Sequence, residues 1–181
     1  LDIYVMNGGK IIASNLTIGN NNTLTIQNGG NLECVSLNLG CPTKNFGTIT
    51  ASKDLTMNLG GHPELFNEGV IDVKGEVRIN GSNVINHHIF SAKTVKVTSV
   101  QLLNKANLNS ATNININGSR IFNYGYIKFD KNDGEIKTDN STATVIINHD
   151  KAKITGHEIE GHLSVYNDGI IEVSEFTSSS L

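Results

Sequence analysis

The stretch that decides the fold is Asn67-Glu-Gly-Val-Ile-Asp-Val-Lys-Gly-Glu-Val-Arg-Ile-Asn80. Apolar and polar residues alternate in it: Ile71 and Val73 flank Asp72, and the same alternation resumes after Lys74-Gly75. A period of two is typical of a half-buried β-strand and not of a helix. The stretch therefore predicts two short strands around a turn at Lys74-Gly75.

The same pattern recurs along the whole chain. An asparagine followed two positions later by glycine, and then by an apolar strand, is found at Asn7, Asn28, Asn45, Asn67, Asn123 and Asn167. Weaker copies without that glycine stand at Asn86, Asn104 and Asn148. The intervals between these nine asparagines run from 17 to 25 residues and average 20. A period near twenty with strands and no helical pattern is typical of a solenoid.

We therefore predict an all-β fold, a single-stranded right-handed parallel β-helix of about nine coils with roughly 20 residues each. The right hand is the favoured one for crossovers between parallel strands. Neighbouring coils pair about 4.8 Å apart, so the coils should form a rod on the order of 40 Å long.

Asparagine suits a repeated corner for two physical reasons. It tolerates the left-handed backbone conformation of a sharp bend, and stacked copies can join their side-chain amides in a hydrogen-bonded ladder. The glycine two residues later lets the chain pass close to the neighbouring coil or adopt positive φ. We therefore interpret the nine asparagines as structural corner residues.

Two irregular segments and the apolar residues of the last coils add further predictions about how the coils align. Residues 58–64 are expected to form a loop, and residues 130–144 stretch the period to 25, which predicts an inserted turn or bulge there. In the last coils the predicted inward residues are Val145, Ile147, Ile154, Leu163, Val165, Ile171, Val173 and Phe176.

Composition bounds the organisation of the chain and its partners. The 181 residues, 38% of them hydrophobic, contain no linker or change of composition, so residues 1–181 are predicted to form one domain. A net charge of −3 without a basic stripe argues against nucleic acid. No apolar run approaches the roughly 18 residues that cross a bilayer, so we expect no membrane insertion within this chain. Neither end carries a cap for its open strand edges, and we expect the chain to be a fragment with more protein or a partner beyond at least one end.

Three groups of residues invite a chemical interpretation. Cys34 and Cys41 either form a disulfide or serve as a core residue and a turn residue. His157 and His162 are five positions apart, which places them on opposite sides of a strand and favours solvated turn residues over metal ligands. Asp130–Gly134 resembles the opening of a calcium loop but lacks the bidentate glutamate and matches a plain turn. We predict no metal site and no cofactor.

An outward column is the best candidate for binding. The residue after each corner asparagine should project into solvent on one edge, which gives Gly8, Gly29, Phe46, Glu68, His87, Lys105, Tyr124, His149 and Asp168. Aromatic faces beside hydrogen-bonding groups suit a polysaccharide or a host or cell-surface protein. The ligand-binding candidates are Phe46, His87, Tyr124, His149 and Tyr126, which stands beside Tyr124. The alternative is that these are merely tolerated corner residues.

Catalysis is the competing function. Parallel β-helices include polysaccharide lyases and glycoside hydrolases, which need clustered acids with a base or a metal on one exposed face. The only arginines are Arg78 and Arg120, about two coils apart, and the carboxylates are scattered singly over the turns. No aligned constellation is present, so we predict a non-enzymatic protein and name no catalytic residue.

The units Leu65–Gly81 and Ile121-Phe-Asn-Tyr-Gly-Tyr-Ile-Lys-Phe129 resemble the repeats of large exported, adhesin-like surface proteins of Bacteroidetes. That resemblance covers most of the chain. It implies an extracellular β-helix that serves as an adhesion or binding module or as a rigid scaffold, and it carries no catalytic residue with it.

Overall fold

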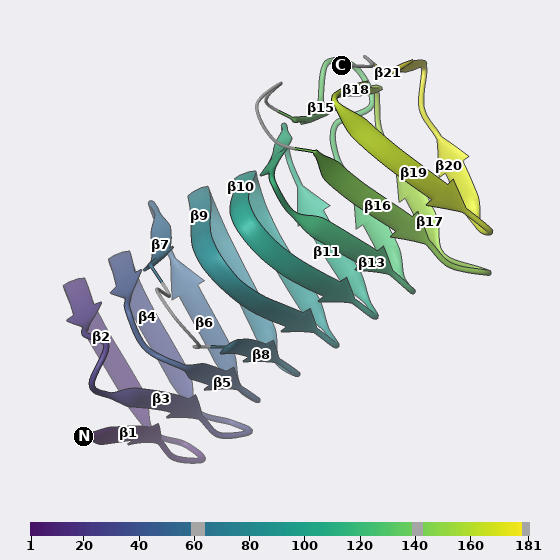
Figure 1. The fold of residues 1–181 in the computed structure, drawn as a ribbon. Helices are drawn as coiled ribbons and strands as arrows, with labels where there is room; N and C mark the ends of the chain where they lie inside the picture. Colours follow the sequence, from purple (N-terminus) through teal and green to yellow (C-terminus); the bar gives the residue numbers. More distant parts are fainter. Residues whose placement is uncertain (59–63, 139–142, 179–181) are drawn as a thin grey trace.

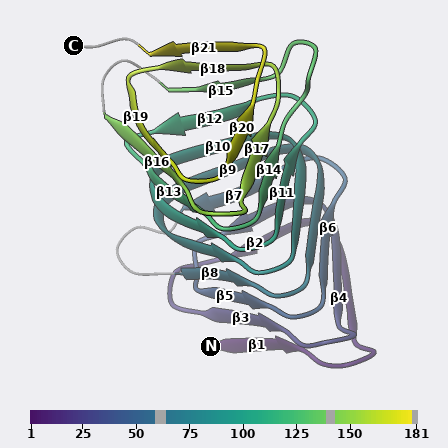
Figure 2. The ribbon, with the colours of Figure 1, turned by 90° about the vertical axis from the view of Figure 1, so that its right-hand side faces the viewer.

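The computed structural model describes residues 1–58, 64–138 and 143–178 and is a parallel β-solenoid of about nine turns with roughly 19 residues per turn. The coils lie side by side along one axis, with the two ends of the chain at opposite ends of the stack (Figure 1). Each coil repeats the path of the one before it (Figure 2). The predicted all-β parallel solenoid is therefore confirmed. Within the described residues, no helix is long and apolar enough to span a membrane.

Each coil contributes one strand segment to each of three faces. The first face contains β1 (Asp2–Val5), β3 (Thr23–Ile26), β5 (Thr43–Asn45), β8 (Glu64–Asn67), the ends of β9 (Val70–Asn86) and β10 (Ile89–Asn104), β13 (Arg120–Asn123), β16 (Thr144–Asn148) and β19 (Leu163–Asn167). The second face contains the first halves of β2 (Lys10–Ile18) and β4 (Asn31–Leu39), then β6 (Thr48–Ala51), the starts of β9 and β10, β11 (Asn107–Ser110), β14 (Tyr126–Lys128), β17 (Lys153–Thr155) and β20 (Ile170–Glu172). The third face contains the second halves of β2 and β4, then β7 (Leu55–Asn58), the middle of β9 and β10, β12 (Ile114–Asn117), β15 (Glu135–Lys137), β18 (Glu158–Gly161) and β21 (Glu175–Ser178).

The core is a set of stacked columns. Every second residue of a strand points inward, and the parallel register places inward residues of successive coils on top of one another. On the first face, for example, one column consists of Leu65, Val84, Leu102, Ile121 and Ile146, each at most 2% exposed. Full burial of such a side chain contributes roughly 1.5–3 kcal/mol. A single coil lacks this cover, so the stack is the folding unit.

The stretch that identifies the fold forms one strand and not two. β9 continues from Val70 to Asn86 through all three faces, where two strands around a turn were expected. The ladder pairing pauses at Lys74 and Gly75, where the chain bends, but the neighbouring coil stays close: a Cβ on Gly75 would lie 2.3 Å from the carbonyl oxygen of Lys53. The close packing of the neighbouring coil leaves room for a bend and none for a projecting turn.

The expected inward residues are wrong at β16. Ile146 is fully buried, and the predicted Val145 and Ile147 point outward. Three consecutive apolar residues carry no alternation, so their sequence cannot assign a face. The stacking of Asn148 on Asn123 sets the register instead, and it places the residue two positions earlier in the core.

The expected alignment of all nine asparagines is also wrong at its start. Asn45 pairs with Ile26 and not with Asn28. In the first coil the corner after Val5 has four residues (6–9), whereas the corner after Asn45 has two (46 and 47). Asn7 and Asn28 occupy this longer turn at the protein surface, and the glycines that follow them have φ of 73° and 78°.

The expected insertion is found at the corner between the second and third faces. Seven residues (129–135) connect Lys128 to Ile136, whereas three (156–158) make the equivalent connection in the next coil. The rest of that expectation concerns residues 139–142, and the expected loop at 58–64 concerns residues 59–63. Both of these segments lie outside the described residues, while Asn58 ends β7 and Glu64 begins β8.

Candidate binding surface

A ladder of buried amides builds the corner between the first and second faces. Asn45, Asn67, Asn86, Asn104, Asn123, Asn148 and Asn167 stack in register, and each Nδ2 donates to the Oδ1 of the next, at distances from 2.7 to 2.9 Å. The first six are at most 1% exposed. We call this corner the asparagine edge.

The second amide proton of each ladder residue is also satisfied. Asn86 Nδ2, for example, donates to the carbonyl oxygens of His88 and Asn107, each at 3.0 Å. A buried amide without hydrogen-bond partners would lower the stability of the fold. The Asn86 amide instead links its own coil to the following coil at the point where the chain turns. The ladder therefore fixes the position of every side chain that projects from the asparagine edge.

Aromatic rings pack against one another at the N-terminal half of this edge. Phe66 lies between Phe46 and His87, with ring centroids 5.9 and 5.3 Å apart and tilted planes. His87 Nδ1 lies 3.5 Å from a carboxylate oxygen of Glu68. Two of the predicted candidates, Phe46 and His87, are thus brought together through Phe66, a ring that the sequence did not single out.

A second ring pair lies in the C-terminal half. Tyr124 and His149 are stacked with centroids 3.8 Å apart and planes 10° from parallel. Tyr124 is 48% exposed, and Tyr126, three positions beyond Asn123 on the second face, is 56% exposed. Of these predicted candidates, the structure brings Tyr124 and His149 together, and it places Tyr126 at an outward position of the adjoining second face.

Sequence reasoning missed the column on the other side of the ladder. The residue before each ladder asparagine points outward on the first face, and from β8 onward this column reads Phe66, Ile85, Leu103, Phe122, Ile147 and Tyr166. Its members are half-buried by one another, except for Tyr166, which is 63% exposed. The sequence indicates this column only indirectly: strand alternation turns the residue before the asparagine outward once the asparagine is known to point inward.

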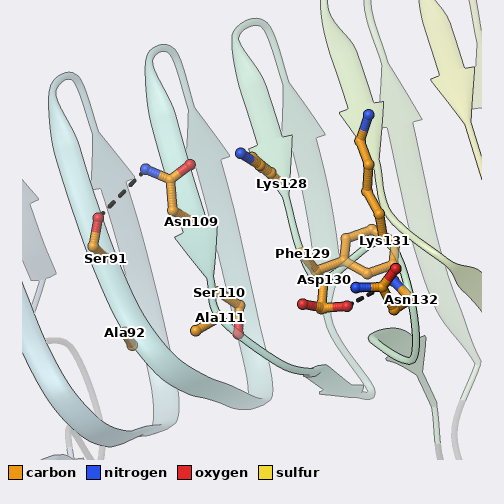
Figure 3. Close-up of a pocket in the computed structure, with 10 residues that line it drawn as sticks. All are labelled: Ser91, Ala92, Asn109, Ser110, Ala111, Lys128, Phe129, Asp130, Lys131 and Asn132. Atoms are coloured by element: carbon orange, nitrogen blue, oxygen red, sulfur yellow. Dashed lines mark hydrogen bonds between the residues drawn. The ribbon is translucent and has the colours of Figure 1, made fainter.

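An open groove of about 790 Å³ lies on the second face, where Lys128, two positions beyond Tyr126 on β14, is one of its lining residues. Ser91, Asn109 and Lys128 stand in a row on three neighbouring strands, and Lys131 rises from the inserted corner beside them (Figure 3). The side-chain amide of Asn109 donates to Ser91 Oγ at 3.4 Å. Hydrogen-bonding groups, two lysines and the carboxylate of Asp130 line the groove, together with the buried ring of Phe129.

Hydrogen bonds within the inserted corner (129–135) stabilise its conformation. Asp130 Oδ1 accepts the backbone N–H groups of Asn132 at 2.6 Å and Asp133 at 3.2 Å, and these bonds lower the pKa of the Asp130 carboxyl. The segment that resembles a calcium loop is therefore a side-chain-capped turn that forms one wall of the groove.

The remaining candidate groups stay apart. Cys34 and Cys41 are both buried free thiols, so the core and turn interpretation describes them and no disulfide joins them. Burial raises the pKa of both thiols. Within residues 1–58, 64–138 and 143–178, His157 and His162 belong to no group of three or more side chains able to hold a metal ion.

Comparisons with known proteins give no relative: no family model, curated protein or solved structure matches this chain.

Proposed function

We propose that this chain is a binding module of an exported bacterial surface protein, and that it holds an extracellular polysaccharide against the asparagine edge. The observation that carries the proposal is the group of exposed rings in the C-terminal half of that edge, Tyr124, Tyr126 and Tyr166. Tyrosine offers an apolar ring face that packs on the C–H face of a sugar and a hydroxyl that bonds its polar rim.

The scaffold supports this function because it holds the rings at fixed spacing. Strand pairing places successive coils about 4.8 Å apart, and the amide ladder ties each corner to the next. A surface that is already ordered loses little conformational freedom when it binds, so more of the contact energy appears as affinity. The repeats that resemble exported adhesin-like proteins support a location outside the cell.

A glycan array followed by titration calorimetry tests the proposal with the purified chain. We expect a polysaccharide to bind, and Tyr124→Ala to weaken it about tenfold, or roughly 1.4 kcal/mol. Tyr124→Phe should retain most of the affinity because it keeps the ring. Tyr4→Ala is the matched control: Tyr4 is similarly exposed, at 56% against 48% for Tyr124, but projects from the first coil, far from the C-terminal rings.

Two results would contradict this function. If the chain depolymerises the polysaccharide, and a single Asp or Glu substitution abolishes turnover, it is a carbohydrate-active enzyme. If no glycan binds but a surface protein does, and Leu103→Asp in the apolar column prevents this, the asparagine edge is a protein interface.

A further inference from the structure

We propose that the groove on the second face binds the acidic groups of the polysaccharide, which makes the ligand a uronate-bearing glycan. This inference rests on the proposed function and adds the chemical class of the ligand. The groove adjoins the asparagine edge and shares Tyr126 with it, and its basic groups belong to the groove alone.

The groove presents a donor at each successive coil. Ser91, Asn109, Lys128 and Thr155 occupy one outward row of the second face, each paired in register with the next. Ser91 Oγ accepts from Asn109, so the serine hydroxyl keeps its own proton to donate. A linear polymer that lies along the solenoid axis meets a hydroxyl, an amide and an ammonium group at intervals of about 4.8 Å.

The charge of the groove favours an anion. The acids of the surrounding face are already paired, Asp72 with Lys74 at 2.5 Å and Glu172 with Lys153 at 2.7 Å. Among the described residues, by contrast, Lys128 is in no ion pair.

The loop at the end of the row extends this excess of positive charge. Lys131 lines the groove without a carboxylate within ion-pair distance in the described chain, and it contributes, after Lys153, to a lower pKa of the Glu172 carboxyl. The carboxylate of Asp130 is engaged by the backbone of its own turn. Although the chain carries a net charge of −3, this groove therefore gathers two available ammonium groups.

Tyr126 adds the component that separates a sugar from a simple anion. It points outward two positions before Lys128 on β14, so its ring and the ammonium group stand on the same face of one strand. A uronate residue presents both features that this pair recognises, an apolar ring face and a carboxylate.

Titration with polygalacturonate and with its fully methyl-esterified form tests the inference, because the two polymers share a backbone and differ in charge. We expect the acidic form to bind at least about tenfold more tightly in roughly 0.05 M salt, and this preference to fall in about 0.5 M salt. The double variant Lys128→Glu/Lys131→Glu should abolish the preference. Lys53→Glu, a single such charge reversal at an exposed corner of the third coil, should leave it intact.

The outcomes separate this inference from the proposed function. If alginate, hyaluronan and polygalacturonate bind no better than neutral dextran and mannan, while Tyr124→Ala still weakens a neutral glycan, the groove inference is wrong and the proposed function stands. If no polysaccharide of either kind binds, both are wrong. If acidic glycans bind but the double variant loses nothing relative to Lys53→Glu, the acid-binding groups lie elsewhere and the groove is not the site.

Discussion

At the scale of single residues, the buried asparagines decide where the chain turns. An amide buried in an apolar solenoid would be costly alone, but each ladder residue accepts from one neighbour and donates to the other. Because all the donors point the same way along the axis, neighbouring bonds polarise and strengthen one another. The ladder is thus a cooperative element, and the loss of one member affects both adjacent coils.

Replacement of Asn86 by alanine tests this view. It removes one of the two acceptors of Asn67 Nδ2 and leaves the Oδ1 of Asn104 buried without its donor. We expect the free energy of unfolding, measured by urea denaturation, to fall by about 2–4 kcal/mol. Asn7→Ala is the control, since Asn7 is an exposed turn residue outside the ladder and should cost less than about 1 kcal/mol. Equal losses in the two variants would mean that the ladder adds nothing beyond turn formation.

The sequence predicted the ladder asparagines from Asn45 onward, but it did not predict the outward apolar column on the first face. Asparagine has few uses inside an apolar repeat, so its period identified seven ladder positions from Asn45 onward. Ile85 and Leu103 gave no comparable signal, because an aliphatic residue in a strand is expected in the core. The strand alternation that assigns them to the surface becomes unambiguous only once the asparagine is known to point inward.

At the scale of strands, the parallel register places equivalent residues of successive coils beside one another. Favourable and unfavourable side-chain contacts are therefore both repeated from coil to coil. On the third face Glu135, Glu158 and Glu175 lie directly beside one another on β15, β18 and β21. Like charges opposite one another on neighbouring strands are destabilising. The pKa of Glu158 is raised above its ordinary value near 4.5. The largest cause is loss of hydration, followed by the nearby carboxylates of Glu160, Glu175 and Glu135.

Because the pKa of Glu158 is raised, the contribution of this residue to the stability of the folded chain depends on pH. The folded chain holds the Glu158 proton more tightly than the unfolded chain does, so this residue favours folding below the ordinary pKa, and that contribution is lost as pH rises through the folded value. Glu158→Gln should therefore raise the melting temperature at pH 7 by about 1–2 °C, and the difference should vanish below about pH 4. Glu64→Gln, at an exposed position of the first face outside this row, is the matched control. A pH-independent gain in both variants would exclude repulsion within the row as the cause.

Element boundaries were predictable where alternation was clean and not where geometry required bends. The pattern around Lys74-Gly75 reads as a turn because a glycine separates two alternating runs, yet close contact with the adjacent coil limits it to a bend within one continuous strand. The insertion near Asp130 was visible as a longer interval. Its use as the wall of a groove depends on neighbouring coils with shorter corners, which no single repeat reveals.

At the scale of the whole molecule, each coil contacts mainly the coils before and after it, so stability should be distributed locally along the axis. Phe129 is the largest fully buried side chain among the residues that the structure describes, and Gly156 of the next coil passes directly over its ring. Phe129→Ala should cost about 3–5 kcal/mol through the cavity it leaves.

Hydrogen exchange measured strand by strand tests how far that loss extends. The Phe129→Ala variant should lose protection in β11, β14 and β17, while β2 and β4 keep theirs, because local opening is confined to the coils that line the cavity. Leu24→Ala in the second coil provides the mirror-image control and should loosen β1, β3 and β5 first. If both variants instead lower protection uniformly over all the coils, the solenoid unfolds as one cooperative unit, and the asparagine ladder is the first candidate for the element that couples its distant coils.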